Sequence, residues 1–272
     1  MENTRNLDKK ISTGSLIDDI TLAVSTQWHA FPERFDWIAA NGFAMAYAPD
    51  PEKLHDTTNH VMPYLKKGVP VHYHGYFPGF ELGDADKHQA EKALDLHMRT
   101  VDTIKGTGGE VMTVHIGLLS AIETRHAHIV QNLGRLAAYA RDRGVKICLE
   151  NLRTGVTSDP EKVVEIAAEC GAFITLDVGH AVSCAQVARG EITVVQIIDM
   201  FRHAMEEVHF YEYETDTHHA PSDMSILGPV VDALLETDCR WWTIELIDYT
   251  DILNTRRLVN NYIIKGDRSL AA

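Results

Sequence analysis

The chain has few cysteines, and no two of them form a Cys-x-x-Cys pair. The four are Cys148, Cys170, Cys184 and Cys239, in a sequence of 272 residues. A chain of this length can bury a core without a disulfide framework, so the cysteines do not suggest a small secreted scaffold. We therefore expect buried free thiols and a cytoplasmic protein.

Long apolar runs and basic runs are also missing. No stretch reaches the ~18 consecutive apolar residues that a membrane span needs, and the polar N-terminus lacks the apolar centre of a signal peptide. The net charge is −14, and lysine and arginine do not cluster. This argues against binding nucleic acid by neutralising its phosphates. We expect a small-molecule substrate, no membrane and no nucleic acid, and we leave a homo-oligomer open.

Short apolar segments alternate along the chain with longer segments of helical periodicity. One helical segment begins with Asp159 and Pro160, a cap followed by proline at the first helical position, and ends at Gly171. The last strand is followed by a closing helix over residues 251–265. Eight segments have the pattern of strands, at residues 20–28, 43–49, 70–77, 110–117, 146–152, 173–181, 207–214 and 240–247.

Strict alternation of strands and helices predicts parallel strands joined by right-handed crossovers. Eight such units predict an α/β fold, a single-domain (β/α)₈ TIM barrel over residues 20–265. Residues 1–19 are then an N-terminal tail or lead-in, and residues 266–272 a C-terminal tail. An open, doubly wound sheet is the alternative, but no glycine-rich fingerprint follows the first strand.

Histidines and carboxylates gather at the C-terminal ends of the predicted strands, where TIM barrels place their functional groups. Side-chain alternation puts Glu150 and Glu245 inside the barrel. Unpaired carboxylates there would cost several kcal/mol, and a divalent metal would remove that cost. The donors suit Zn²⁺, Mn²⁺ or Co²⁺ and also Fe²⁺, and Mg²⁺ less well. The strand ends and the loop after the seventh strand supply His74, His115, Glu150, Asp177, His180, His209, Asp216, His218 and Glu245.

The other histidines have a simpler interpretation. The chain holds 15 histidines, a high count, and seven of them fall in segments with helical patterning. We expect these to be surface residues with no role in a site. They are His55, His60, His88, His97, His126, His128 and His203.

Three strand ends resemble those of the xylose isomerase-like TIM-barrel superfamily. They are Cys148-Leu149-Glu150-Asn151, Leu176-Asp177-Val178-Gly179-His180-Ala181 and Thr243-Ile244-Glu245-Leu246. The superfamily includes sugar isomerases and epimerases, inosose dehydratases and the endonuclease IV group, and the resemblance covers roughly residues 20–265. It implies a metal held by Glu150, Asp177, His209 and Glu245.

The resemblance to the endonuclease IV group goes further, because that group binds three zinc ions. It implies additional ligands among His74, His115, His180, Asp216 and His218. The chain also departs from that group: residues 22–26 lack its Gly-Ala-His start, the loop over residues 209–216 is short, and no DNA-penetrating loop is recognisable. It departs from ketose epimerases as well, since no arginine follows His209 closely.

Two enzymatic functions follow from this resemblance, and we favour the first. A metal-dependent isomerase or epimerase of a small sugar or polyol would pass through an enediolate. Glu150 and Glu245 would move a proton on opposite faces of the substrate, and His180 would orient a hydroxyl. Substrate-binding candidates are Arg153, Trp28, His74 and His115, although Arg153 is equally consistent with a surface salt bridge and Trp28 with loop packing.

The alternative is an endonuclease IV-like hydrolase of a phosphoester, with two or three zinc ions and Glu150 bridging two of them. A metal-binding barrel without catalysis is the third hypothesis.

Overall fold

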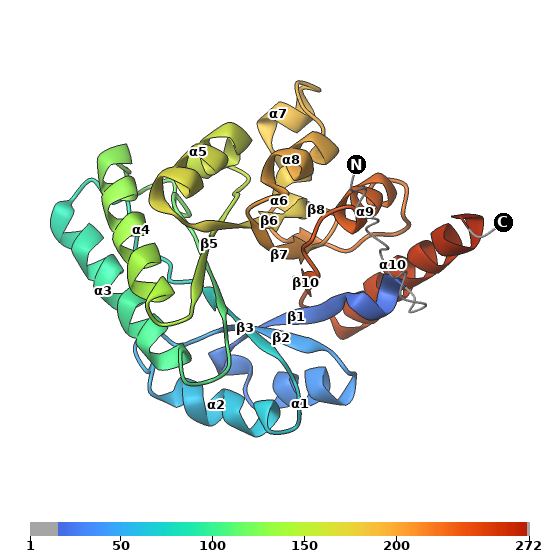
Figure 1. Cartoon of the computed structure of the whole chain (residues 1–272), viewed down its shortest axis with the longest axis horizontal. Coiled ribbons are helices and arrows are strands. Elements are labelled where there is room, and N and C mark those ends of the chain that lie inside the picture. The colour runs from blue at the N-terminus through green and yellow to red at the C-terminus, as the bar shows by residue number, and fades with distance from the viewer. Residues whose placement is uncertain (1–15, 271–272) are drawn as a thin grey trace, which may run out of the picture.

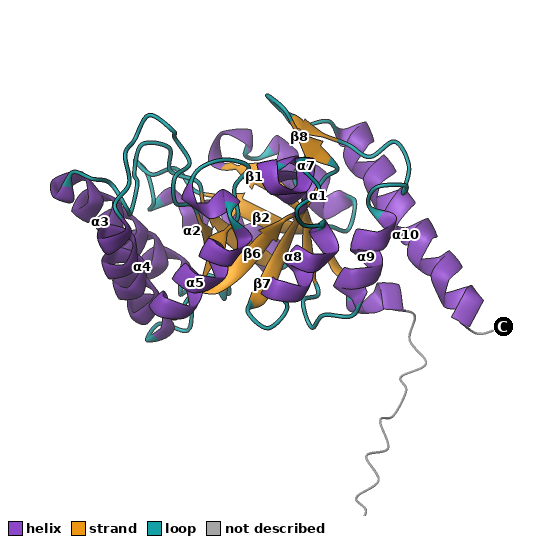
Figure 2. Ribbon diagram, turned by 90° about the horizontal axis from the view of Figure 1, so that it is seen from above, coloured by secondary structure: helices purple, strands orange, loops and turns teal. Residues whose placement is uncertain are grey.

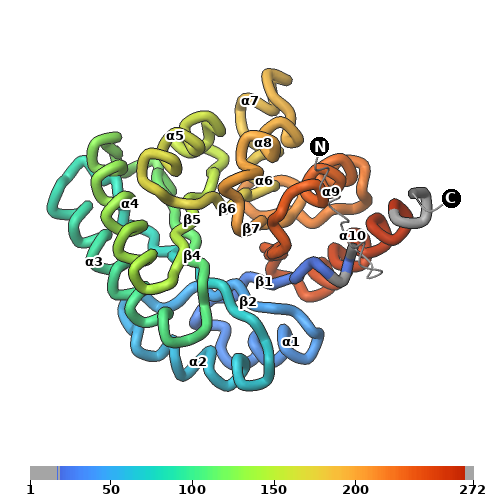
Figure 3. Tube along the Cα trace, in the orientation of Figure 1, coloured from blue at the N-terminus to red at the C-terminus, as the bar shows by residue number. Residues whose placement is uncertain are grey.

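The computed structural model describes residues 16–270, which form a closed barrel of eight parallel strands (Figure 1). Around the barrel the order is β1-β10-β7-β6-β5-β4-β3-β2, so the first and last barrel strands pair and close it (Figure 3). This confirms the predicted TIM barrel. The barrel strands are β1 Thr21–Gln27, β2 Ala44–Ala48, β3 Val71–Gly75, β4 Val111–Val114, β5 Lys146–Glu150, β6 Phe173–Asp177, β7 Met205–Phe210 and β10 Trp241–Ile244.

The helices surround the strands as an outer layer (Figure 2). The final helix begins at Tyr249 and runs to Leu270, so it extends beyond the predicted end at Lys265. Short 3₁₀ segments cover Leu16–Asp19, Trp28–Ala30 and Val156–Ser158. The α-helices are α1 Glu33–Ala40, α2 Asp56–Leu65, α3 Lys87–Ile104, α4 His126–Arg141, α5 Pro160–Cys170, α6 Val178–Ser183, α7 Ala185–Ala188, α8 Val194–Phe201, α9 Gly228–Leu235 and α10 Tyr249–Leu270.

Local capping explains how α5 begins and ends. The Asp159 side chain accepts a hydrogen bond from the backbone N–H of Glu161, and Pro160 occupies the first helical position. At the other end Gly171 has a φ of 65°, the left-handed conformation that glycine adopts without a steric penalty. The helix therefore starts and stops where the sequence predicts.

Two predicted strands are too long because a new element begins inside each. The segment predicted over residues 173–181 leaves the barrel after Asp177, whose side chain accepts a hydrogen bond from the backbone N–H of His180 and caps α6. The segment predicted over 207–214 leaves it after Phe210. Beyond it, β8 (Tyr213–Glu214) pairs with β9 (His218–His219) in an antiparallel hairpin.

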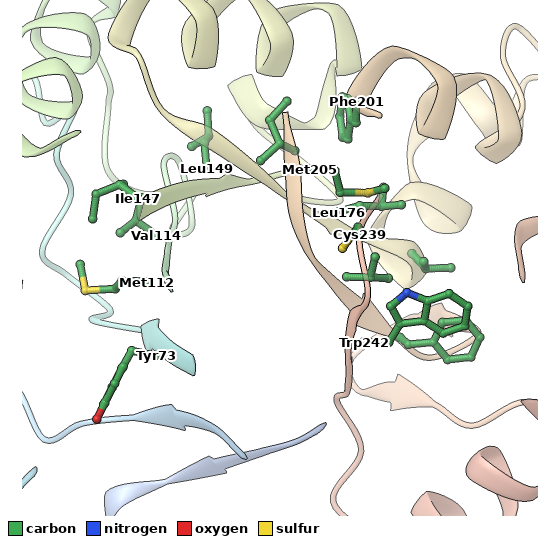
Figure 4. Packing of buried hydrophobic residues seen from close by; sticks show 14 of the residues in the cluster. Tyr73, Met112, Val114, Ile147, Leu149, Leu176, Phe201, Met205, Cys239 and Trp242 are labelled. Carbon is green, nitrogen blue, oxygen red and sulfur yellow. The ribbon is translucent and has the colours of Figure 1, made fainter. Parts of the chain in front are cut away.

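Apolar side chains fill the layer between barrel and helices. Leu149 and Leu176 are fully buried there and lie beneath the outer helices in Figure 4. Because side chains alternate along a strand, their neighbours Glu150 and Asp177 project into the barrel instead. The hydrophobic core therefore lies outside the strands, while the upper barrel interior carries polar groups.

The state of the cysteines agrees with the expectation from the sequence. All four cysteines are free and buried. Among residues 16–270, no helix combines the length and apolar character needed to cross a membrane. His97 differs from the surface location expected for it: it is buried on α3, donates from Nδ1 to the carbonyl of Ala93 and packs edge-on against Phe77.

Candidate metal centre

The four residues that the family resemblance implies as metal ligands converge inside the barrel. Nδ1 of His209 lies 3.4 Å from Oε1 of Glu150, 3.9 Å from Oδ2 of Asp177 and 3.6 Å from Oε1 of Glu245. Glu150 ends β5, Asp177 ends β6, His209 lies on β7, and Glu245 directly follows β10. None is more than 8% exposed, so one nitrogen and three carboxylates face each other almost out of contact with water.

Two further histidines complete one side of this group. Nε2 of His115 lies 3.0 Å from Oε2 of Glu150, and Nε2 of His74 lies 3.4 Å from the same oxygen. Nδ1 of His74 lies 3.5 Å from Oε1 of Glu245, so its ring stands between the two glutamates. With His180, these residues are called the buried cluster below: His74, His115, Glu150, Asp177, His180, His209 and Glu245.

A second group of side chains adjoins the buried cluster under the β8–β9 hairpin. Nε2 of His180 lies 3.3 Å from Oε2 of Glu214, and Nε2 of His218 lies 3.8 Å from Oε1 of Glu214. Asp216, expected from the resemblance to join this group, is instead exposed in the hairpin turn. Glu214 takes that place because it pairs directly opposite His218, which puts both side chains on one face of the hairpin.

Asn151, which follows Glu150, joins the ends of two strands. Its side-chain amide donates to the carbonyl of Asp177 and accepts from the Asp177 backbone N–H. Its own carbonyl lies 2.9 Å from Nδ1 of His180. These bonds account for the Glu-Asn pair at the end of β5, because they hold Asp177 and His180 beside Glu150.

Side-chain packing explains why position 179 is a glycine. Any Cβ at this position would overlap the ring of Tyr211, which is fully buried beside α6. The Tyr211 ring also stacks on His218 with centroids 4.0 Å apart. The glycine of the Asp-Val-Gly-His motif therefore lets Tyr211 approach α6 closely and support His218.

The electrostatics of the buried cluster are those of a cation site. Burial alone opposes protonation of His74 and His180, yet the neighbouring carboxylates raise the pKa of His74 to about 9 and that of His180 to about 10. Burial raises the pKa of Asp177 to about 6. Without a metal, protonated imidazoles must therefore supply the positive charge that balances the buried carboxylates.

The donor atoms fit a divalent ion. Buried polar atoms normally have partners, but here Oε2 of Glu150, Oδ2 of Asp177 and both ring nitrogens of His209 have no hydrogen-bond partner. Four sets of three residues have ligand atoms within 4.8 Å of one another, and imidazole with carboxylate suits a transition metal. The sets are His74–His115–Glu150, His74–His209–Glu245, Glu150–Asp177–His180 and His180–Glu214–His218.

Of the four substrate-binding candidates, His74 and His115 belong to the buried cluster, whereas Arg153 and Trp28 lie nearer the surface. Arg153 places its Nε 3.1 Å from Oε2 of Glu214, so it forms an ion pair at the edge of the second group. Trp28 is 39% exposed in the short 3₁₀ segment after β1, where its ring contacts His29 edge-on. Arg153 is thus connected to the buried cluster through Glu214, whereas Trp28 lies on the rim of the barrel.

Glu207 is a further buried carboxylate, which the pattern of strand ends did not identify. Glu207, two residues before His209 on β7, is 1% exposed inside the barrel. Burial alone would raise its pKa, but His209 and His72 lower it. Glu207 could have been identified from its spacing to His209, because residues two apart on a strand point to the same face of the sheet.

Comparisons with known proteins identify the family. The model of the "Xylose isomerase-like TIM barrel" family matches residues 36–261. The chain belongs to this family. A relative in sequence is the uncharacterized protein MJ0008 of Methanocaldococcus jannaschii, 29% identical over 213 residues, which cover 78% of this chain and 89% of that protein.

Solved structures of similar fold include sugar epimerases. A D-tagatose 3-epimerase-like protein superposes with a TM-score of 0.73 at 18% identity, covering 92% of this chain and all of that one. The TTHB071 protein from Thermus thermophilus, from a crystal soaked with ZnCl₂, gives 0.69 at 17% identity, covering 89% and 98%. At these identities the likeness shows the fold alone.

Proposed function

We propose that this member of the family is a divalent-metal-dependent isomerase or epimerase of a small sugar or polyol-type substrate. The observation that carries the proposal is the position of the two glutamates around His209. Glu150 and Glu245 lie within 3.4 and 3.6 Å of the same imidazole nitrogen, yet they come from strands separated in the barrel by β6 and β7. They therefore approach one point from different sides.

In this proposal Glu150, Asp177, His209 and Glu245 hold the metal. A bound divalent ion polarises a carbonyl oxygen and makes the adjacent C–H more acidic. One glutamate removes that proton and the other returns one on the opposite face of the enediolate. His180 directs Nδ1 to the carbonyl of Asn151 and holds Nε2 beside Oε2 of Glu214, and from there Nε2 would orient a substrate hydroxyl.

The burial pattern supports entry of a small substrate from the strand-end side. Glu150 and Asp177 are closed off, at 1% and 0% exposure, whereas His74, His180 and Glu245 each retain 8%. The side of the cluster that still touches solvent thus includes one of the two glutamates. Substrates that reach it must be small or must present one narrow end.

Proton exchange with solvent tests this chemistry directly. The metal-loaded protein is incubated in D₂O with a panel of aldoses, ketoses and cyclic polyol ketones, and each is followed by NMR. We expect one substrate class to gain deuterium at the carbon next to the carbonyl, and the Glu150→Gln and Glu245→Gln variants to lose this exchange. Metal-loaded, folded protein that neither exchanges nor converts any member of the panel would contradict the proposal.

A second candidate function is hydrolysis of a small phosphoester by a multinuclear zinc centre. It is favoured by the sets His74–His115–Glu150 and His180–Glu214–His218, which share no residue with each other, although the first shares Glu150 with the central ligands. Each offers three donors for a further ion, and two or three ions can bind phosphate oxygens and generate hydroxide. Hydrolysis of bis(p-nitrophenyl) phosphate that rises with a second and third equivalent of zinc would favour this function over isomerisation.

A further inference from the structure

The two nitrogens of His209 face different carboxylates. Nδ1 faces Glu150 and Glu245 in the buried cluster, while Nε2 points down the barrel toward Oε1 of Glu207, at 3.5 Å. An imidazole that binds a metal through one nitrogen carries its proton on the other. A carboxylate beside Nε2 therefore favours the form of His209 in which Nδ1 presents its lone pair.

We propose that Glu207 is a positioning residue for the metal centre: it orients His209 so that Nδ1, and not Nε2, is presented as the ligand. The inference rests on the metal site of the proposed function and is independent of which reaction that site performs. This role requires only a small movement of the two side chains. Shortening the distance of 3.5 Å between Nε2 of His209 and Oε1 of Glu207 by a few tenths of an ångström brings the two atoms into ordinary hydrogen-bond range.

Glu207 is itself held on both oxygens. Oγ1 of Thr243 donates to Oε1 at 2.6 Å, and Nδ1 of His72 lies 3.0 Å from Oε2. The His72 ring stacks on Trp241 with centroids 3.6 Å apart and planes 9° apart. Nε1 of Trp241 donates to Oγ1 of Thr243, so residues of β3 and β10 fix the carboxylate in one orientation.

Glu207 and the residues that hold it lie on the side of the buried cluster away from the C-terminal ends of the strands. His72 and Trp241 line a cavity of about 430 Å³ together with residues at the starts of β1 and β7, such as Thr21 and Met205. This is the N-terminal end of the barrel. Groups placed there cannot touch a substrate that enters from the strand ends, which separates a positioning role from a catalytic one.

A buried carboxylate is not needed to fill the barrel interior at the height of Glu207. Other strands fill the same level with uncharged side chains: Thr113 and Thr175 share a hydrogen bond of 2.7 Å, and Cys148 is fully buried. A carboxylate is costlier to bury than these groups. Its position next to Nε2 of His209 fits a role in orienting that ring.

The test is metal affinity, measured on the full chain by competition with a chromophoric chelator. Loss of such an outer carboxylate weakens binding about 10–100-fold, so we expect Glu207→Gln to raise the Kd for Zn²⁺ and Co²⁺ by that factor. The visible spectrum of the Co²⁺ protein should change as well. The matched control is Glu206→Gln, because Glu206 is the adjacent residue but pairs with Lys146 at 2.8 Å; it should leave both unchanged.

A second pair of variants covers the case in which Glu207→Gln fails to fold. Thr243→Val removes the donor to Glu207 but keeps the volume, and Thr243→Ser restores the hydroxyl. We expect Thr243→Val to weaken Co²⁺ binding about 5-fold and Thr243→Ser to bind as the parent does. Folded Glu207→Gln or Thr243→Val protein with parental affinity and spectrum overturns the inference.

These outcomes are distinct from failure of the proposed function. Parent protein that binds metal more tightly than Glu207→Gln, but catalyses no exchange in D₂O, would overturn the isomerase proposal and leave the role of Glu207 intact. Solvent exchange in the parent together with an unchanged metal affinity in Glu207→Gln would overturn the role of Glu207 and leave the isomerase proposal intact. Parent protein that takes up no metal would overturn both.

Discussion

Oε2 of Glu214 lies 3.3 Å from Nε2 of His180, where the β8–β9 hairpin meets the buried cluster. The backbone N–H of Glu214 is held by the hydroxyl of Ser183 on α6, at 2.8 Å. Arg153 pairs with the same carboxylate oxygen at 3.1 Å. Glu214 thus connects a residue of the cluster to a cation at its edge. Its substitution can therefore test whether His180 serves the central ion, a substrate or an additional ion.

Substitution of Glu214 separates those roles. If one ion occupies the central ligands, as we expect, Glu214→Gln leaves the metal content near one ion per chain and mainly raises KM, because His180 loses its partner while the ion keeps its own ligands. A multinuclear centre would instead lose about one ion and much of its kcat. Asp216→Asn is the control: its side chain is exposed two residues away and should change neither quantity.

Purified protein is expected to carry tightly bound transition metal, because three carboxylates and an imidazole converge with unpartnered atoms. Elemental analysis on protein prepared without chelator measures this. The expectation is wrong if the protein holds less than about a tenth of an ion per chain and takes up no Zn²⁺, Mn²⁺ or Co²⁺ when these are added.

Glu150→Gln and Glu245→Gln should each reduce turnover at least ~100-fold, under either proposed chemistry, because both remove a charged donor from the same centre. Thermal unfolding of the variants checks that the barrel is intact. Turnover within a factor of ~3 of the parent in a folded, metal-loaded variant would exclude that glutamate from the reaction.

The stability of the metal-free protein should fall at alkaline pH. The pKa of His74 is raised to about 9 and that of His180 to about 10, above the ~6.5 of an unfolded histidine. Their contribution is full below pH ~6.5 and is lost as the pH rises through 9 to 10.

We expect Tm of the metal-free protein to drop by ~5 °C or more over that interval, since one kcal/mol corresponds to about 2–4 °C for a chain of this size. The metal-saturated protein should drop less, because the ion replaces protons as the counter-charge. Calorimetry measures Tm for both proteins. Equal decreases in Tm for the metal-free and the metal-saturated protein would contradict this explanation.

Binding to duplex DNA should be weak or undetectable at ~150 mM salt, because the net charge is −14 and no basic run is present. Fluorescence anisotropy with intact duplex and with duplex containing an abasic site measures it. Sub-micromolar affinity for the abasic duplex would overturn this expectation and support phosphoester hydrolysis.

The resemblance to the xylose isomerase-like superfamily singled out Glu150, Asp177, His209 and Glu245 as one set of ligands. The sequence by itself determined the barrel and the gathering of histidines and carboxylates at the C-terminal ends of its strands. Both depend on local rules. Alternation of strand and helix predicts parallel strands, and alternation of side chains along each strand says which residues face inward. Since parallel strands end at the same side of a barrel, polar residues at their C-terminal ends must meet there.

Only the tertiary structure decided which neighbours these residues have. Glu214 rather than Asp216 faces His180 because the hairpin pairs Glu214 with His218, a register that spacing alone does not specify. His72 meets Glu207 across the barrel, from β3 to β7. Such contacts depend on how the strands are staggered when the sheet closes. That stagger is a property of all eight strands together, so no single segment of the sequence encodes it.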